Sequence, residues 1–369
     1  MNFCKAAMEL AFQAKGYTSP NPAVGAVVVK NSRIIGRGST SPGGRPHAEY
    51  NAIINAGISL CRGALLYVTL EPCSHFGKTP PCTDIIKTAG IKKVIIAGKD
   101  PNPLAAAQTG RILKQAGITA EFSFPGEYAK KLQELNEDFF KYIITSEPFV
   151  SIKYAMTLEG KIALGNGDSR WISSPAARCY VHYLRRISDA VMTGAGTVRA
   201  DNPRLDARYE IKKKPLRVIV ARNPDFNRKN HVLSGSGPTL FIIPPGCAKF
   251  KKQADQYNKY YEEFPLDRGE FNFKKIFRVL AEKYNCISVL AEGGGYLLGS
   301  ILTQRAADKL YAFIAPKLTG GGGIHPFSSA PEASAMAKAS VLYNVQTETF
   351  ENNVLFKGYF NKNDHLSKP

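Results

Sequence analysis

Two short segments constrain how this chain folds, because their side chains must meet in space to act together. Residues 46–49 carry His47 and Glu49, and residues 71–82 carry Cys73 and Cys82. The first segment opens a predicted helix that begins at a proline and ends before Gly57. The second follows a predicted buried strand and ends in a second helix start. The sequence therefore predicts that two helix starts and a strand end converge.

His47, Cys73 and Cys82 are three ligands of the kind that a catalytic Zn²⁺ site uses, with its fourth tetrahedral position left to water. Zinc lowers the pKa of that water toward ~7, and Glu49 is placed to carry its proton without binding the metal. This set of groups is typical of zinc-dependent base deaminases. Eight residues separate the cysteines where two are usual, so structural cysteines with a core histidine are the alternative. His75 is a second candidate ligand, which we expect on the substrate side.

The length of 369 residues fits two domains. Residues 1–145 alternate between strand and helix patterns and predict a three-layer α/β/α domain with a mixed sheet. Residues 146–369 begin a second α/β alternation after a linker at 145–148, and we expect 249–264 to be a surface connection. Strands are expected at 24–29, 33–37, 64–70, 93–97, 118–122, 149–155, 190–193, 216–221, 239–243, 288–291, 309–314 and 354–359. Helices are expected at 3–14, 47–57, 83–89, 104–116, 128–144, 175–186, 273–284 and 295–302.

Charge and cysteine usage narrow the class of protein. The formal charge is +19, but the basic residues are spread over both domains without a block like a nucleic-acid-binding arm. Such a surface suits small anionic ligands as well as nucleic acid. Seven scattered cysteines fit a reducing compartment better than a disulfide framework. With no apolar run near ~20 residues and no signal-peptide pattern, we expect a cytoplasmic protein without a membrane partner.

Over nearly its whole length the chain resembles the bifunctional riboflavin-biosynthesis deaminase–reductases of bacteria. The likeness rests on the run Pro-Cys-Ser-His-x-Gly-x-Thr-Pro-Pro-Cys at 72–82 and on the order of the domains. It implies a cytidine-deaminase-like domain that deaminates 2,5-diamino-6-ribosylamino-4(3H)-pyrimidinone 5′-phosphate. It also implies a second domain, similar to dihydrofolate reductase, that uses NADPH to reduce the ribosyl group to ribityl.

The resemblance further implies roles for individual residues. In the first domain, Asn21 would read the pyrimidine edge, for which a carboxamide offers both a donor and an acceptor. Lys78 would meet the phosphate, while Asp100 and Asn102 would orient the substrate. In the second domain the implied substrate-binding residues are Ser169, Arg185, Leu205, Arg208 and Glu292, with Arg204 as a further candidate for the sugar phosphate. The implied cofactor-binding residues are Ala155, Trp171, Thr197, Asp201, Gly293, Gly294 and Gly295.

Some questions stay open at this point. Lys153, Glu159 and Glu292 are all candidates for the proton donor of the reductase. Glu159 stands where the family usually has Asp, Asn202 replaces a common Asp, and Ala107 and Thr109 replace expected glycines that shape substrate access.

The rival functions are an RNA base deaminase, a deaminase whose second domain is only structural, and a non-enzymatic zinc-binding module. We expect a homo-oligomer that acts on a small phosphorylated pyrimidine, with no nucleic-acid partner.

Overall fold

The computed structural model describes residues 2–77, 79–102, 108–208 and 214–362. The chain divides into two compact units, one running from the N-terminus to Glu147 and the other beginning at Pro148. None of the described helices is both long enough and apolar enough to span a bilayer.

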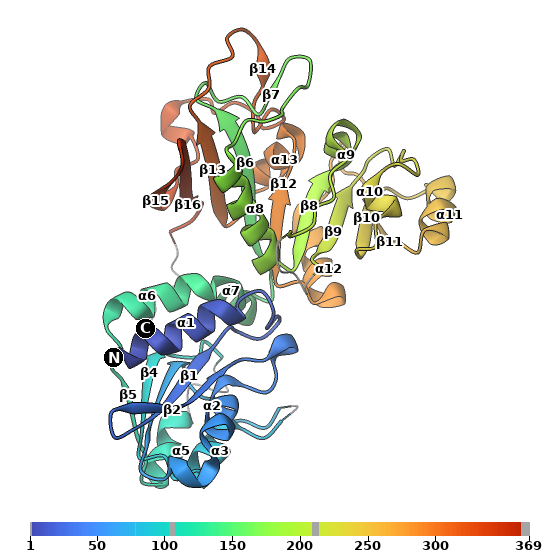
Figure 1. Cartoon of the computed structure of the whole chain (residues 1–369). Coiled ribbons are helices and arrows are strands. Elements are labelled where there is room, and N and C mark those ends of the chain that lie inside the picture. Colours follow the sequence, from blue (N-terminus) through green and yellow to red (C-terminus); the bar gives the residue numbers. More distant parts are fainter. Residues whose placement is uncertain (1, 78, 103–107, 209–213, 363–369) are drawn as a thin grey trace. The chain divides into compact units, whose positions relative to one another are not determined.

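The N-terminal unit is built on a five-stranded mixed sheet (Figure 1). Its order is β2-β1-β3-β4-β5, in which β1 is antiparallel to both neighbours and the last three strands are parallel. Buried valine, isoleucine and leucine side chains fill the central strands, as expected where both faces of a sheet are covered. The strands are β1 (Gly25–Lys30), β2 (Arg33–Ser39), β3 (Leu65–Leu70), β4 (Lys93–Gly98) and β5 (Thr119–Phe122).

Helices cover both faces of this sheet and complete the three layers predicted from the sequence (Figure 1). One face carries α1 (Phe3–Ala14), α6 (Gly126–Leu135) and α7 (Glu137–Thr145). The other carries α2 (Ala48–Ala56), α3 (Cys82–Thr88) and α5 (Thr109–Gln115).

The single helix expected over 128–144 is wrong, because the chain breaks at Asn136 between α6 and α7. Asn136 is fully buried, and its side chain accepts from the Ala23 N–H at 2.8 Å and donates to the Ala23 carbonyl at 3.0 Å. These contacts with a distant loop explain why a helical pattern in the sequence is interrupted at this residue.

The C-terminal unit contains a nine-stranded sheet of order β11-β10-β9-β8-β12-β6-β13-β16-β15. The strands from β11 to β13 are parallel, and β16 and β15 extend the sheet in antiparallel fashion. The strands are β6 (Phe149–Thr157), β8 (Ala190–Gly194), β9 (Leu216–Val220), β10 (Thr239–Ile243), β11 (Tyr260–Glu263), β12 (Ser288–Glu292), β13 (Lys309–Ala315), β15 (Tyr343–Phe350) and β16 (Asn353–Tyr359). A separate pair, β7 (Ala163–Leu164) and β14 (Gly323–Ile324), forms a small ribbon.

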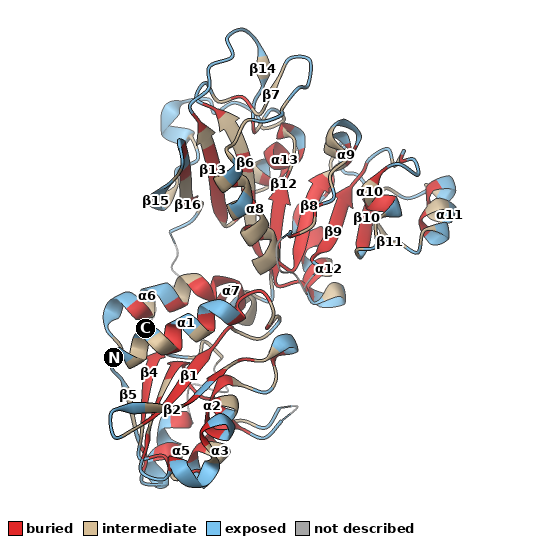
Figure 2. Cartoon of the chain, in the orientation of Figure 1, coloured by how far each residue is buried: buried red, intermediate tan, exposed pale blue. Residues whose placement is uncertain are grey.

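Alternating residues of these strands pack against helices on the two faces, and the burial is concentrated in the strands (Figure 2). The helices on one face are α8 (Pro175–Ile187), α9 (Ala195–Asp201), α10 (His231–Ser234) and α11 (Ala248–Gln256). Those on the other are α12 (Phe273–Tyr284) and α13 (Gly295–Thr303).

The surface connection expected over 249–264 is wrong, because this segment forms α11 and the edge strand β11. Phe250 and Ala254 lie one helical turn apart and are both buried. Phe250 packs against Phe226 and Phe241, so its burial rather than any long apolar pattern stabilises the helix. The edge strand β15 was also not expected from its largely exposed residues.

Candidate active sites

The N-terminal unit brings His47, Cys73 and Cys82 together from three local structures. His47 is the N-cap residue of α2, Cys73 follows the end of β3, and Cys82 is the first residue of α3. Their potential ligand atoms all lie within 4.8 Å of one another. The predicted convergence of two helix starts and a strand end is therefore present.

The spacing of these atoms fits one tetrahedral metal ion. His47 Nδ1 lies 3.2 Å from Cys82 Sγ and 3.5 Å from Cys73 Sγ. Ordinary zinc–sulfur and zinc–nitrogen bond lengths place two ligands of one ion roughly 3.5 Å apart. Among the described residues, His75 is not part of this cluster. The donor set of one imidazole and two thiols is therefore suited to zinc and leaves one position open.

The local electrostatics favour a thiolate and a proton-carrying carboxyl group. The Cys82 thiol and His47 lower the pKa of Cys73, and the Cys82 backbone N–H adds a bond to its sulfur at 3.3 Å. Burial raises the pKa of Glu49 to about 7, although His47 opposes this. Glu49 is 4 % exposed and lines the same pocket as His47 and Cys73.

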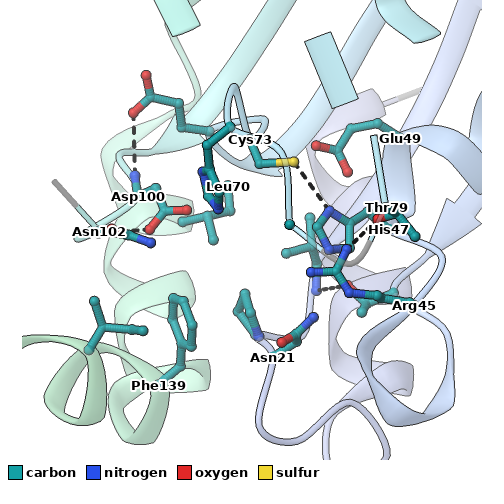
Figure 3. A pocket seen from close by; sticks show the side chains of 17 residues that line it. Asn21, Arg45, His47, Glu49, Leu70, Cys73, Thr79, Asp100, Asn102 and Phe139 are labelled. Atoms are coloured by element: carbon teal, nitrogen blue, oxygen red, sulfur yellow. Dashed lines mark hydrogen bonds between the residues drawn. The ribbon is translucent and has the colours of Figure 1, made fainter. Parts of the chain in front are cut away.

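The pocket beside this cluster has a volume of about 170 Å³ and is lined from several elements (Figure 3). Asp100 and Asn102 lie on one side, where the Asn102 N–H donates to the Asp100 carboxylate at 2.9 Å. Asn21 donates to the Gly44 carbonyl at 2.9 Å, which orients its side-chain amide. Gly44 has φ +87° and a Cβ there would lie 2.6 Å from the Asn21 side chain, so a glycine is needed for this contact.

The sequence did not indicate every residue of this pocket. Arg45 and Thr79, which are hydrogen-bonded to each other, line it together with Glu71 and Phe139. Arg45 directly precedes Pro46, and Glu71 and Thr79 lie within residues 71–82, so their positions in or beside the two motifs could have suggested a role. Phe139 comes from α7, where no local pattern marks it.

Other predicted residues of the first domain have different outcomes. Lys78 and Ala107 lie outside the described residues. His75 lines the pocket, and its Nδ1 is buried with no hydrogen-bond partner in the described part of the chain. Thr109 is fully buried and donates to the Pro72 carbonyl at 2.8 Å, which ties the start of α5 to the segment that carries Cys73.

The C-terminal unit contains a larger cavity of about 1170 Å³. It lies where the carboxyl ends of four adjacent parallel strands, β9, β8, β12 and β6, meet, the usual place for ligands in such sheets. It is lined by every residue to which the family resemblance gives a substrate- or cofactor-binding role in this domain: Ala155, Ser169, Trp171, Arg185, Thr197, Asp201, Arg204, Leu205, Arg208, Glu292, Gly293, Gly294 and Gly295.

A buried ion-pair group lies at the floor of this cavity. Arg185 binds Glu292 through two hydrogen bonds of 2.7 and 3.0 Å, and Lys153 Nζ lies 3.8 Å from the same carboxylate. Burial alone would raise the pKa of Glu292, but Arg185 and Lys153 hold it below its ordinary value. Burial lowers the pKa of Lys153. The Arg185 guanidinium is thus engaged in hydrogen bonds to Glu292. The Arg208 side chain is half exposed and is more accessible to a ligand.

The turn after β12 has a geometry that fits a phosphate-bearing ligand. Gly293 has φ +146°, and a Cβ there would lie 2.7 Å from Thr193 Oγ1. That hydroxyl is fully buried, lines the cavity and has no partner among the described residues. At position 295 glycine is required by close packing, because a Cβ atom there would lie 2.2 Å from the His325 carbonyl oxygen. The turn therefore needs a glycine at 293 and leads directly into the start of α13, where backbone N–H groups can bind a phosphate.

Glu159 does not line the cavity, although it was a candidate proton donor. Its carboxylate accepts from the Thr319 N–H at 2.7 Å and the Gly320 N–H at 3.0 Å. These bonds lower its pKa to about 2. Asn202 likewise has a structural contact, accepting from the His231 N–H at 2.8 Å.

Several basic side chains of the cavity were not expected. Arg170, Arg178, Arg199 and Arg222 line it, and Arg178 stacks on Trp171 with its guanidinium 4.5 Å from the ring centre. They come from separate elements, so only the folded sheet brings them together.

Comparison with known protein families matches both units. Residues 1–98 match the cytidine and deoxycytidylate deaminase zinc-binding region, and residues 148–356 match the RibD C-terminal domain.

Full-length relatives span both units. The riboflavin biosynthesis protein RibD of Aquifex aeolicus is 42% identical over 323 residues, covering 87% of this chain and 88% of that protein. RibD of Synechocystis is 37% identical and covers 97% of this chain and 95% of its own length. The crystal structure of a diaminohydroxyphosphoribosylaminopyrimidine deaminase/5-amino-6-(5-phosphoribosylamino)uracil reductase from Thermotoga maritima is 36% identical, with a TM-score of 0.84 and 97% of each chain covered.

Proposed function

The chain belongs to the RibD family of bifunctional riboflavin-biosynthesis deaminase–reductases, and we propose that its two cavities perform the two reactions in sequence. The N-terminal pocket would deaminate 2,5-diamino-6-ribosylamino-4(3H)-pyrimidinone 5′-phosphate. The C-terminal cavity would then reduce the ribosyl group of the product to ribityl with NADPH. Membership of this family does not favour an RNA base deaminase, an inert second domain or a non-enzymatic zinc module.

The observation that carries the proposal is the convergence of His47, Cys73 and Cys82 within 4.8 Å, beside the buried carboxyl group of Glu49. Zinc held by these three residues would supply hydroxide at neutral pH and an electrophilic centre. Glu49 would take up the proton of the water and release it to the departing amino group. A pKa near 7, which burial gives this carboxyl group, suits both halves of that transfer.

The remaining pocket residues would position the pyrimidine phosphate. Asn21 keeps its carbonyl oxygen available to the ring edge because its amide nitrogen is bonded to Gly44. Asp100 and Asn102 line another side of the same pocket (Figure 3) and would contact the ring from there. Lys78 is proposed to bind the phosphate, and Arg45 is well placed to assist it.

In the second cavity, NADPH would supply a hydride to C1′ of the opened ribosylamine. Thr197, Asp201 and the Gly293–Gly295 turn would hold the cofactor, with Ala155 and Trp171 beside its reacting ring. Ser169 and Leu205 would contact the substrate and the exposed Arg208 its phosphate, while Arg185 keeps Glu292 ionised and in place. Because Glu159 lies outside the cavity, Lys153 and Glu292, which both line it, remain the proposed candidates for the proton donor.

We further propose that the protein works as a homo-oligomer in the cytoplasm, where its cysteines, which form no disulfide, stay reduced.

Product masses test the proposal directly. The purified protein is incubated with the diaminopyrimidinone phosphate, with and without NADPH. We expect one amino group to be exchanged for oxygen in both samples, and two hydrogens to be gained only where NADPH is present. An unchanged substrate would contradict the proposed deaminase. Deamination without any reduction in the presence of NADPH would contradict the proposed reductase.

A further inference from the structure

We propose that Arg222 selects a dinucleotide that carries a 2′-phosphate over one that lacks it. This inference rests on the proposed reductase function and assigns the adenosine end of its cofactor.

The strand order places Arg222 at the end of the cavity opposite the reacting groups. The cavity crosses strands β9, β8, β12 and β6 in that order. Trp171 lies at the β6 end of the cavity, because its carbonyl accepts a hydrogen bond from Lys317, which follows β13, the strand next to β6. Arg222 and Asn223 directly follow Ala221 at the end of β9 and line the cavity there. Three inter-strand steps separate β6 from β9, about 14 Å, a span that an extended dinucleotide covers.

The glycine turn after β12 divides these two ends. A cofactor whose diphosphate lies at Gly293–Gly295 and whose nicotinamide lies at Ala155 and Trp171 must direct its adenosine toward β9. The polar groups that meet it there are Arg222, Asn223, Glu270, Tyr296 and Ser300.

The Arg222 guanidinium is held in a fixed position at this end. It lies 4.1 Å from the centre of the Tyr296 ring, and its Nη1 donates to the Tyr296 hydroxyl at 2.7 Å and the Gly269 carbonyl at 3.1 Å. Within the described part of the chain, both hydrogen bonds of the Arg222 side chain are made by Nη1. The N–H groups of Nη2 and Nε can therefore donate to a ligand. A planar guanidinium with two donors to offer matches a phosphate monoester.

Glu270 limits how strongly this end of the cavity binds a phosphate. Its carboxylate is held by the Tyr296 hydroxyl and by Ser300 Oγ at 3.0 Å, and it lies 3.9 Å from Arg222 Nη1, beyond hydrogen-bond distance. It therefore only partly neutralises Arg222, and it repels a phosphate that does not reach the guanidinium. Replacing it should strengthen binding of the 2′-phosphate, the opposite of replacing Arg222.

Binding titrations test this without turnover. Trp171 is the chain's single tryptophan and lines the cavity, so energy transfer to the reduced nicotinamide reports NADPH and NADH. Calorimetry with 2′,5′-ADP and 5′-AMP isolates the adenosine end. We expect the wild type to prefer NADPH and 2′,5′-ADP. Arg222→Gln should reduce both preferences by about 10- to 100-fold while NADH affinity stays within a few fold. Glu270→Gln should increase both preferences.

A matched control removes a different positive charge from the same cavity. Arg199 lines it from α9, so Arg199→Gln should weaken NADPH and NADH alike. A preference that survives Arg222→Gln, or one that Arg199→Gln abolishes instead, would overturn the assignment. If the wild type bound neither dinucleotide, the proposed reductase would fail and this inference with it. NADPH binding with an unchanged preference in the Arg222 variant would refute only the inference.

Discussion

The two sites of this chain are built in different ways. The N-terminal pocket of about 170 Å³ has its metal-binding and proton-carrying groups within 36 residues of sequence, at the ends of α2, β3 and α3. The C-terminal cavity of about 1170 Å³ draws its groups from residues 153 to 328, across the ends of four strands. A site whose side chains bind one metal ion must be small and rigid. A cavity that binds both a dinucleotide and a sugar phosphate must be long. The first can be encoded by a short motif and the second only by a sheet.

Loss of zinc should have the largest effect, because it should abolish the activity of the first site and leave ligand binding at the second unchanged. Cys82→Ala removes one of three ligands, so we expect no bound metal and no deamination. NADPH binding, followed through Trp171, should persist because all the described residues that line the reductase cavity belong to the second unit. Metal analysis and the titration measure the two effects. Loss of NADPH affinity together with zinc would show that the sites depend on each other.

Loss of the proton carrier should act on chemistry alone. Glu49→Gln preserves the size of a buried side chain, so zinc content should not change while deamination falls by about 10²- to 10⁴-fold. Single-turnover assays without NADPH measure this step. Near-normal turnover with zinc bound would remove Glu49 from the mechanism.

Breaking the buried ion pair between Arg185 and Glu292 should lower the reductase activity and the stability of the second unit. Glu292→Gln leaves Arg185 and Lys153 without their counter-charge, so we expect reduction to fall about 10²-fold and the C-terminal unit to lose about 3 kcal/mol of stability. The pKa of Glu292 is depressed in the folded state, so its contribution is complete at neutral pH and is lost as the pH falls through that value. The variant should therefore be less sensitive to acid.

A matched control for this variant is Glu348→Gln. Glu348 is also 3.8 Å from a lysine, Lys357, but is half exposed. Its removal should change stability by less than about 1 kcal/mol and leave reduction unchanged. Equal effects of the two substitutions in thermal unfolding would contradict the special role of burial at Glu292.

The smallest effect expected is indirect. Asn136→Ala would leave the Ala23 N–H and carbonyl unpaired and free the loop that carries Asn21, costing about 2 kcal/mol. We expect the KM for deamination to rise about 10-fold with kcat little changed. Asn2→Ala, which removes the N-cap of α1, should cost about 1 kcal/mol and leave KM unchanged. A KM shift in both variants would indicate general destabilisation.

The same contrast explains how far the sequence predicts this molecule. His47, Glu49, Cys73 and Cys82 follow from local signals, since a helix start and a strand end can be recognised within a few residues. The parallel strands of the second unit other than β11 are equally clear from their apolar runs, whereas β11 is short and partly exposed. Asn136 could not be recognised as a helix break, because its partner Ala23 is distant in sequence. Arg222 and Tyr296 meet only through the strand order, and the Arg185–Glu292 pair joins residues 107 positions apart.

X-ray absorption at the zinc edge of the purified protein tests the central claim most directly. We predict one zinc per chain, bound by one nitrogen and two sulfur ligands from His47, Cys73 and Cys82 and by one water oxygen. Exchange of that oxygen for a substrate-like inhibitor should leave the sulfur shell unchanged. A shell of four protein ligands, or a protein that deaminates its substrate without any bound metal, would contradict the account.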